Sequence, residues 1–447
     1  MLPTKNAALD KALLVSIRTP DITDAEAEES LAELVRLVTT LGFKVVATRS
    51  QRQSGTGGVT VVGSGKLQEL ARLTRKKANL SHIDQEDIDS GNDQNVSINP
   101  PAELADVVIF DCDLTPSQMR NLENALGVEV LDRTGVIIEI FSRHARTRAA
   151  RLQVEIARLN YLTPRLRDSR GGNKERHMGR GAGENALELD RRRVRDRLAE
   201  LRQELEVVQR EMGGRRSSRA SQFCVALVGY TNAGKSSTMR ALTGSEVLVQ
   251  DKLFATLDTT VRAMHPETQP RILISDTVGF VKKLPHDLVA SFRSTLDEAH
   301  DASLLLYVVD ASDPGFRSQL AIVNEVLEDI GVEDTPKLLL LNKSDRLNDE
   351  QKKNLLQEFP EAILFSTRNP EDIHILHQRI VSFAEQDMVE EEIRVPYTVK
   401  GVIGEIRATM RVIKEDYDPD VMRLHVRARL VDLEKIRKLL EPQKRAS

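Results

Sequence analysis

The stretch from Val225 to Thr238, VALVGYTNAGKSST, holds the residues best suited to chemistry. Its core is G-x-x-x-x-G-K-S, from Gly229 to Ser236. Glycines at this spacing let backbone N–H groups surround nucleotide phosphates at the positive end of the following helix. Lys235 would reach the β- and γ-phosphates, and the Ser236 hydroxyl would bind Mg²⁺. A simple glycine turn with a lysine on it is the alternative, but four apolar residues before the loop and a helix-compatible run after it disfavour that reading.

A second acidic segment would complete the metal site. Asp276-Thr277-Val278-Gly279 follows an apolar run, which places Asp276 to hold Mg²⁺ through water and the Gly279 N–H to contact the γ-phosphate. Thr256, in the run FATLD, is the candidate for a mobile threonine that completes Mg²⁺ coordination in the triphosphate state, with Thr259 and Thr260 as alternatives. The predicted metal residues are Ser236, Thr256 and Asp276.

The run Asn342-Lys343-Ser344-Asp345 identifies the base. The Asp345 carboxylate can accept parallel hydrogen bonds from the N1–H and 2-amino groups of guanine, a donor pair that adenine lacks. GTP rather than ATP is therefore the predicted ligand, with Asn342 bracing the loop, Lys343 over the base, and backbone N–H groups at residues 366–367 finishing the pocket. The predicted nucleotide-binding residues are Gly229, Asn232, Ala233, Gly234, Lys235, Ser236, Ser237, Phe254, Ala255, Thr256, Asp276, Thr277, Val278, Gly279, Asn342, Lys343, Asp345, Ser366, Thr367 and Arg368.

These motifs require a sheet that brings them to one edge. Apolar strands that end in polar residues are predicted within 253–262, 271–280, 303–312, 337–345 and 362–368. Open α/β sheets bind ligands at the carboxyl ends of their strands. We therefore predict an α/β phosphate-loop GTPase domain over residues 221–386, with a mainly parallel sheet and helices on both faces.

The flanking sequence predicts two smaller domains. Residues 1–135 form an α/β domain in which strands and helices alternate along a mainly parallel sheet. The strands are expected at 12–17, 43–48, 59–63 and 106–111, and the helices at 26–41, 66–77 and 116–126. The turn at residues 63–66, GSGK, is interpreted as a turn into a helix, because Thr60 stands where a phosphate loop needs its first glycine. Residues 387–447 form a small α+β domain, whose first strand is expected at 393–399, after an acidic run at Glu390 to Glu392.

Residues 136–220 predict an arginine-rich helical hairpin. Apolar residues at steps of three, four and seven, from Leu152 to Leu166 and from Leu187 to Met212, match a coiled-coil seam. Residues 142–220 carry 20 arginines and one lysine against 11 acidic residues, within a chain whose net charge is −4. Such segments favour phosphate, and RNA above all, although a solvated face with internal ion pairs is the alternative. The predicted RNA-binding residues, in or beside the glycine-rich connector, are Arg165, Arg167, Arg170, Lys174, Arg176 and Arg180.

Composition limits the protein class. No apolar run approaches the length of a membrane span, and the N-terminus lacks the basic start and apolar core of a secretory signal. Cys112 and Cys224 stand far apart, which argues against disulfides and zinc sites. We expect a cytoplasmic protein without stable membrane insertion, without DNA as a partner, and monomeric when it is not bound to its partner.

Together these segments resemble the HflX family of translation-associated GTPases. The likeness is carried by DTVGFVKKLPHDLVASFRSTL (276 to 296) and DRTGVIIEIFSRHARTRAARLQVEIARL (132 to 159), and the most family-specific pieces are the LPHDLV run and the run from DRT to LQVE. The resemblance covers most of the chain and implies GTP and Mg²⁺ binding, association with the large ribosomal subunit and its RNA, and splitting or rescue of stalled ribosomes. ATP-linked RNA unwinding is ascribed to some members.

The connector departs from the family pattern. The family usually carries GGxGxRGPGETQLExDRR, whereas this chain has GGNKERHMGRGAGENALELDRR, with Ala182 for proline and Asn185-Ala186 for threonine-glutamine. The departure bears on how the protein contacts ribosomal RNA. It leaves the nucleotide chemistry unaffected.

Phe280 stands where many related GTPases place a glutamine that orients the attacking water. Phenylalanine can neither donate nor accept a hydrogen bond, so no catalytic side chain is assigned and slow intrinsic hydrolysis is expected. Asn232 matches a phosphate-loop asparagine that coordinates K⁺ in similar GTPases, which makes K⁺ a second candidate cofactor beside Mg²⁺.

The sequence thus predicts a GTP-binding and hydrolysing switch that engages the large ribosomal subunit. Two other functions stay open. One is an RNA-remodelling NTPase in which nucleotide turnover licenses release. The other is a protein-partner switch that uses the helical hairpin as a coiled-coil surface.

Overall fold

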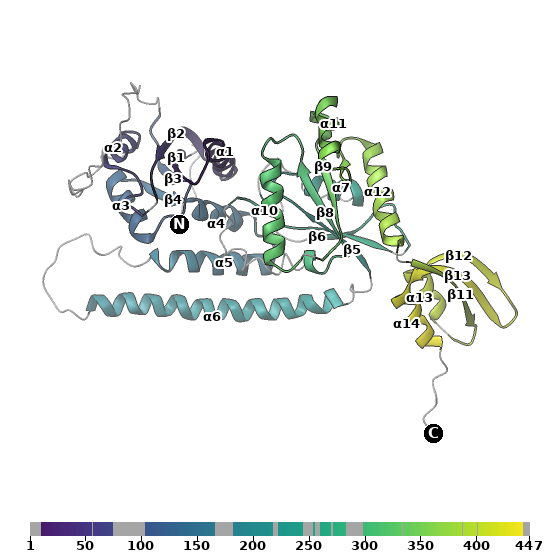
Figure 1. Cartoon of the computed structure of the whole chain (residues 1–447). Coiled ribbons are helices and arrows are strands. Elements are labelled where there is room, and N and C mark those ends of the chain that lie inside the picture. The colour runs from purple at the N-terminus through teal and green to yellow at the C-terminus, as the bar shows by residue number, and fades with distance from the viewer. Residues whose placement is uncertain are drawn as a thin grey trace. The chain divides into compact units, whose positions relative to one another are not determined.

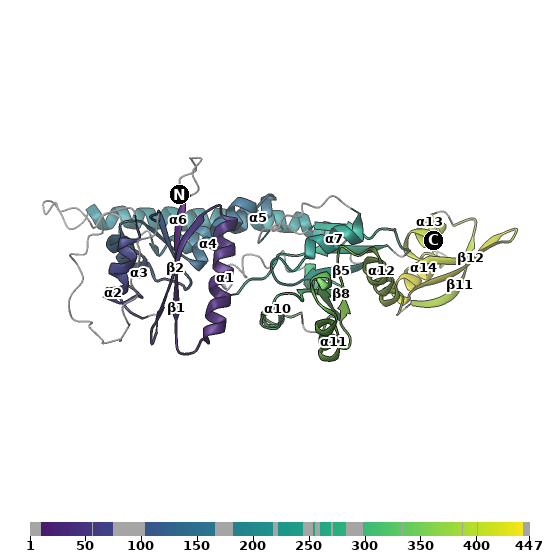
Figure 2. The same cartoon turned by 90° about the horizontal axis from the view of Figure 1, so that it is seen from above.

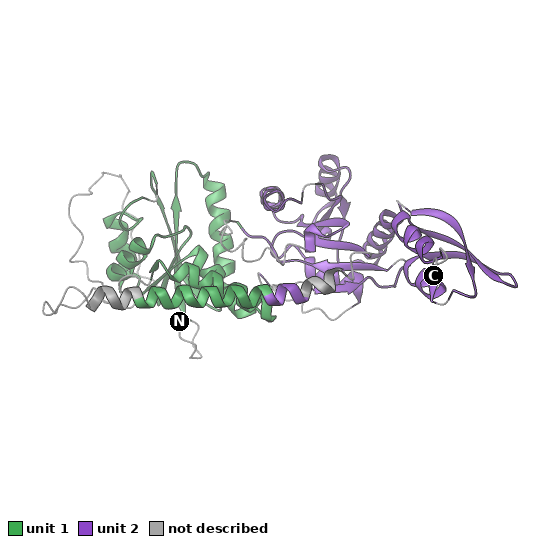
Figure 3. Cartoon of the chain, turned by 90° about the horizontal axis from the view of Figure 1, so that it is seen from below, with its two compact units in different colours: residues 1–206, 282–291 green, residues 207–281, 292–447 purple. Residues whose placement is uncertain are grey.

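The computed structural model describes most of the chain (Figure 1). It comprises two compact units, Met1–Glu206 with Lys282–Ser291, and Val207–Val281 with Phe292–Ser447 (Figure 3). The described residues are 10–55, 57–74, 103–165, 182–217, 222–244, 254, 260–269, 271–282, 298–332, 334–386, 388–399 and 401–440.

The first unit contains a four-stranded parallel sheet in the order β2-β1-β3-β4 (Figure 1). Capping boxes begin the first and third helices: Thr23 and Thr115 each accept a hydrogen bond from the third residue of the helix, whose side chain bonds back. The elements in chain order are β1 (Lys11–Arg18), α1 (Asp24–Thr40), β2 (Lys44–Arg52), α2 (Ser64–Arg72), β3 (Val107–Phe110), α3 (Pro116–Leu126) and β4 (Glu129–Asp132).

One predicted strand of this sheet is wrong. Residues 59–63 form bends, with Val61 at φ +61°, and lead into α2 at Ser64. Val61 and Val62 are buried in the core, so their apolar character serves packing rather than a strand ladder. The fourth strand is instead β4, whose four residues are too short for an alternation pattern to reveal.

Three helices follow the sheet: α4 (Arg133–His144), α5 (Arg148–Leu162) and α6 (Ala182–Ser217). The first begins inside the predicted N-terminal domain and packs against α1 and α5. Helices α5 and α6 run side by side in opposite directions, as Figure 1 shows, and Arg148 at the start of α5 pairs with Glu204 on α6 at 3.4 Å. The predicted helices of the hairpin are therefore present, although most of the connector lies outside the described residues.

The second unit holds a six-stranded sheet in the order β10-β9-β8-β5-β7-β6, parallel except where β6 joins β7. Helices α7 and α12 share one hydrophobic cluster with the sheet, and α10 and α11 share another, so helices cover both faces. The elements are β5 (Phe223–Val228), α7 (Lys235–Thr243), β6 (Thr260–Ala263), β7 (Ile272–Asp276), β8 (Leu304–Asp310), α10 (Phe316–Asp329), β9 (Lys337–Asn342), α11 (Asp349–Glu358), β10 (Ile363–Leu364) and α12 (Pro370–Glu385).

Two strands of this sheet are shorter than predicted. The strand expected within 253–262 begins only at Thr260, and Phe254 lies in a turn with φ +58°. The strand expected within 362–368 is limited to Ile363–Leu364. After Leu364 the chain leaves the sheet for the segment that carries the predicted nucleotide-binding residues Ser366, Thr367 and Arg368.

The last part of the second unit is a three-stranded antiparallel sheet in the order β11-β13-β12. Alternate residues of β13 are buried against α13 and α14, which gives the predicted α+β arrangement. The acidic run at 390–392 lies inside β11 rather than before it. The elements are β11 (Met388–Pro396), α13 (Val402–Thr409), β12 (Arg411–Tyr417), β13 (Val421–Arg429) and α14 (Leu430–Leu440). No helix in the described ranges is long and apolar enough to cross a membrane.

Candidate functional site

The phosphate loop connects β5 to α7 and depends on two glycines. Gly229 has φ +151°, and a Cβ added there would lie 2.2 Å from the carbonyl oxygen of Val308 on β8. Gly234 has φ +103°, and its Cβ would lie 2.1 Å from Nδ2 of Asn342. The approach of the Val308 backbone therefore fixes glycine at position 229, and at position 234 the positive φ and the buried Asn342 amide do so.

Lys235, the first residue of α7, points back into this loop. Its Nζ donates hydrogen bonds to the carbonyl oxygens of Gly229 at 3.0 Å and Tyr230 at 2.8 Å. The side chain is buried, and burial lowers the pKa of the Lys235 ammonium to about 8, although the Asp276 carboxylate opposes this shift. A phosphate bound here would restore the charged form, because it brings negative charge to the ammonium.

This pKa predicts that nucleotide affinity depends on pH. Below pH 8 the ammonium is charged in the empty and the bound protein, so affinity is constant. Above pH 8 the empty protein must take up a proton to pair with phosphate, and the Kd for GDP should rise by about tenfold per pH unit. Titration of a fluorescent GDP analogue in EDTA from pH 7 to 10 measures this without a metal that titrates alongside. Lys235→Arg is the control, because its guanidinium stays charged and its affinity should depend less on pH.

Two of the three predicted Mg²⁺ residues, Ser236 and Asp276, meet at the start of α7 and the end of β7. Ser236 Oγ donates to Oδ2 of Asp276 at 2.7 Å, and Asp276 is fully buried. A hydroxyl and a carboxylate are hard oxygen ligands of the kind that Mg²⁺ prefers, so the donor set fits this ion. Bound Mg²⁺ would supply positive charge against the phosphate oxygens. Thr256, the third predicted metal residue, lies outside the described residues, as does Ala255.

The segment after β7 lies directly beside the phosphate loop. Phe280 N–H donates to the Gly229 carbonyl at 3.2 Å, and the Phe280 carbonyl accepts from the Thr231 N–H at 2.8 Å. A Cβ on Gly279 would lie 3.0 Å from Nζ of Lys235. The structure thus brings together two motifs that are about 50 positions apart in the sequence. The Phe280 side chain is buried, so it is not placed to orient a water molecule.

The loop after β9 is braced against the phosphate loop. Nδ2 of Asn342 donates to the Ala233 carbonyl at 2.7 Å, which confirms the predicted bracing. Lys343, with φ +61°, donates from Nζ to the Asn232 carbonyl at 2.8 Å and pairs with Asp310 at 2.6 Å. Asp310 was missed by sequence reasoning, although a carboxylate at the end of a buried strand is a signal that could have identified it.

Asp345, the predicted guanine contact, is held by two neighbouring side chains. Ser366 Oγ donates to Oδ1 of Asp345 at 2.8 Å, and the Arg368 guanidinium lies 3.4 Å from Oδ2. The hydrogen bond from Ser366 is the main cause that holds the pKa of the Asp345 carboxyl below its usual value, so this group is ionised at neutral pH. The Ser366 N–H donates to Asp372 at 2.8 Å rather than pointing to a base, which leaves Thr367 as the residue of the pair for that role.

The remaining predicted residues take supporting places. Thr277 is buried, and its hydroxyl donates to the Leu227 carbonyl at 2.7 Å, which ties the end of β7 to β5. The polar residues that follow β5, β7, β8 and β9 all lie at the carboxyl edge of the parallel strands, where such sheets bind ligands. Ser237 lies in the first turn of α7, Val278 between Asp276 and Gly279, and Phe254 in a turn.

Arg165, a predicted RNA contact, is half-buried and held by contacts within the protein. Its guanidinium pairs with the buried Asp132 at 2.8 Å, donates to the Tyr161 carbonyl at 2.6 Å, and stacks 3.4 Å above the Tyr161 ring. It contributes to packing beneath β4, where a phosphate would have to displace Asp132. The other five predicted RNA-binding residues lie outside the described residues.

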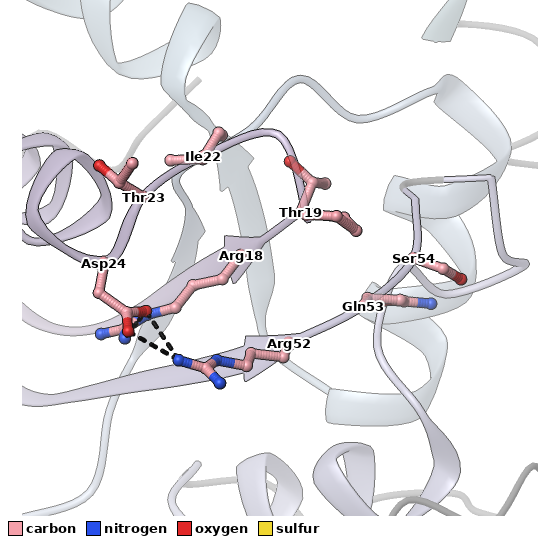
Figure 4. Close-up of a pocket in the computed structure, with 9 residues that line it drawn as sticks. Arg18, Thr19, Ile22, Thr23, Asp24, Arg52, Gln53 and Ser54 are labelled. Atoms are coloured by element: carbon pink, nitrogen blue, oxygen red, sulfur yellow. Dashed lines mark hydrogen bonds and ion pairs between the residues drawn. The ribbon is translucent and has the colours of Figure 1, made fainter.

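The first unit has a cavity of about 580 Å³ at the carboxyl ends of β1 and β2. Figure 4 shows Arg18 and Arg52 directed at the same carboxylate, that of Asp24, at 3.0 Å and 2.7 Å. The hydrogen bond from Arg52 is the main cause that lowers the pKa of Asp24. The single Asp24 carboxylate balances only one of the two guanidinium charges, and the Arg52 side chain is 75% exposed.

Three family models match the chain. Residues 28–98 and 87–142 match "GTP-binding GTPase N-terminal", and residues 144–219 match "GTP-binding GTPase Middle Region". Residues 224–343, which carry the phosphate loop, the DTVG segment and the start of the guanine loop, match "50S ribosome-binding GTPase". Among solved structures, the chain is similar to a GTP-binding protein from the archaeon Sulfolobus solfataricus in complex with GDP, at 23% identity and a TM-score of 0.43, over 85% of this chain and 99% of that one.

Similarity to curated proteins extends over nearly the whole chain. The chain is 55% identical to the GTPase HflX of Gluconacetobacter diazotrophicus over 93% of its own length and 95% of that protein. It is 36% identical to the GTPase HflX of Caldanaerobacter subterraneus, over 92% of this chain and 89% of that one. The predicted phosphate loop, metal-binding pair and guanine contact lie at one sheet edge, and with this similarity over nearly its whole length the chain belongs to the HflX family of GTPases, which bind GTP and hydrolyse it.

Proposed function

We propose that this GTPase binds the large ribosomal subunit in its GTP state and acts in ribosome splitting or rescue under stress. The observation that carries the proposal is the match of residues 224–343 to a family model described as a 50S ribosome-binding GTPase. Slow hydrolysis in the absence of a partner fits this role, because the buried Phe280 leaves the attacking water to be positioned by another group.

The arginine-rich hairpin supports RNA as the surface that is bound. Arg192, Arg195 and Arg202 of α6 are exposed, whereas Arg193 and Arg197 on the same helix pair with acidic neighbours. We propose that the exposed arginines act with the predicted connector residues on ribosomal RNA phosphates. The connector residues of this proposal are Arg167, Arg170, Lys174, Arg176 and Arg180.

Sedimentation with purified ribosomal subunits tests the proposal. The full chain should move with the large subunit in a non-hydrolysable GTP analogue, and much less with GDP or without nucleotide, and it should sediment as a monomer when ribosomes are omitted. Binding should weaken steeply as salt rises, because phosphate contacts release counterions. Equal comigration in all three nucleotide states contradicts the switch, and binding that salt does not weaken indicates a protein surface instead of RNA.

We further propose that K⁺ assists hydrolysis beside Asn232. This residue has φ +60°, and its carbonyl oxygen accepts from Lys343, so its backbone is fixed next to the phosphate loop. A monovalent cation there would supply charge that an arginine finger supplies elsewhere. We predict that GTP turnover is about tenfold or more faster in K⁺ than in Na⁺ at equal ionic strength, and that Asn232→Ala removes this difference. Equal rates in the two salts for the unaltered chain would rule the proposal out.

A further inference from the structure

Arg133 is a buried arginine at the start of α4. Its guanidinium lies 2.7 Å from Asp111 after β3 and also pairs with Glu33 of α1, which packs against α4 (Figure 2). Its Nε donates a hydrogen bond to the main-chain carbonyl of Lys282 at 3.2 Å. A buried guanidinium between two carboxylates is fixed in place, because movement would leave uncompensated charge. The Lys282 carbonyl is therefore held by a rigid donor.

The side chain of Lys282 makes a second contact with the same unit. Its Nζ lies 2.9 Å from a carboxylate oxygen of Glu29, and only 17% of the side chain is exposed. Glu29 and Glu33 are four residues apart, so they lie on one face of α1. Main chain and side chain of Lys282 are thus both held by α1 and α4. Lys282 accordingly belongs to the first compact unit, whereas Val281 belongs to the second.

Lys282 stands three residues after Gly279, the predicted γ-phosphate contact. Phe280 is hydrogen-bonded through its own N–H and carbonyl to the phosphate loop, and Val281 is 1% exposed. A single buried residue therefore separates the backbone fixed to the phosphate loop from the backbone fixed to Arg133. One residue spans at most about 3.6 Å, so Lys282 can move only slightly before Phe280 must move with it.

We propose that Arg133 is a positioning residue for GTP hydrolysis, which acts through the Lys282 carbonyl to hold the DTVG segment against the phosphate loop. Hydrolysis depends on donors that are already in place where charge develops on the phosphate, and a looser segment loses that placement. The proposal is independent of ribosome binding. It also gives a role to the DRT run, which carries much of the family resemblance but none of the predicted nucleotide-binding residues.

Single-turnover GTP hydrolysis by the full chain tests this role. Glu29→Gln removes the ion pair of Lys282 from a helix that does not contact nucleotide, and should lower kcat by about two- to fivefold, the range expected for a partly exposed pair. Arg133→Lys loses the Nε donor and should lower kcat by about tenfold. KM and the Kd for GDP should stay unchanged in both. Exchange of the charges, Glu29→Lys with Lys282→Glu, should restore kcat to within about twofold of the unaltered chain.

Glu103→Gln is the matched control. Glu103 pairs with Lys44 at 2.8 Å in the same unit and has a similar exposure, 35% against 42% for Glu29, but it makes no contact with Lys282. It should leave kcat unchanged. An unchanged or higher kcat in Glu29→Gln, an equal loss in the control, or failure of the exchanged pair to recover overturns the proposal. Arg133→Lys removes part of a buried charge cluster, so its kcat is interpreted only if thermal unfolding shows that the variant is folded. If it is not folded, the kcat values of the Glu29 and Lys282 variants test the proposal.

Discussion

Replacement of Asp345 by asparagine is expected to lower the affinity for GTP by at least about a hundredfold, since two charge-assisted hydrogen bonds are lost. The carboxylate can accept from both the N1–H and the 2-amino group of guanine, and the asparagine amide would turn a donor toward one of them. The same variant should bind xanthosine triphosphate more tightly than GTP, because xanthine carries a carbonyl at C2 that accepts from the new amide. Competition of each nucleotide against a fluorescent GDP analogue measures both effects.

Asp349→Asn provides the control for this experiment. It makes the same chemical change at the start of α11, where the side chain is almost fully exposed, and should leave both affinities unchanged. Retention of GTP affinity by Asp345→Asn would contradict the guanine contact. Equal loss of GTP and xanthosine triphosphate binding would point to a damaged fold, which the unfolding midpoint of the variant would reveal.

Replacement of Gly229 by alanine should both destabilise the second unit and abolish nucleotide binding. The new Cβ would lie 2.2 Å from the Val308 carbonyl, a backbone atom that can yield only by moving β8. Overlap of this kind, together with the unusual φ, should cost about 3 kcal/mol or more. The Gly229 carbonyl also accepts from Lys235 and from the Phe280 N–H, so a shifted loop would disturb both.

Urea unfolding and GDP titration measure the two effects separately. Gly404→Ala is the matched control, because Gly404 lies in α13 of the same unit with open space around it. A helical alanine there should be neutral or should stabilise by up to about 1 kcal/mol. A Gly229→Ala chain that unfolds at the original urea concentration and still binds GDP would show that the close approach to Val308 is not required.

The sequence predicted those parts of the site whose functional residues are close neighbours along the chain. The phosphate loop, the DTVG segment and the run from Asn342 to Asp345 each carry their function within a few residues, so residue type and spacing suffice. The parallel order of the large sheet follows from the same reasoning, because polar residues at the ends of apolar strands must meet at one edge.

What sequence reasoning missed depends on partners far apart in the chain. Arg133 meets Glu33 across 100 positions, and Lys343 meets Asp310 across 33, and no periodicity records such pairs. Arg165 was assigned to RNA from the charge of its surroundings, whereas burial beside Asp132 gives it an intramolecular partner. Val61 and Val62 show the same limit, since an apolar run reports burial and not hydrogen-bonding pattern.

The discontinuous first unit has a consequence for synthesis and for truncation. A growing chain completes residues 1–206 long before residue 282 is made. Lys282, which α1 and α4 hold, is therefore among the last residues of the first unit to be synthesised. Domains fold as they emerge, N-terminal first. The nascent N-terminal part therefore lacks the Lys282 carbonyl, which accepts a hydrogen bond from Nε of Arg133, until part of the nucleotide-binding sequence has emerged. A fragment that ends at residue 206 would keep that unfinished condition permanently, and its behaviour would report an intermediate of assembly rather than a separable half of the enzyme.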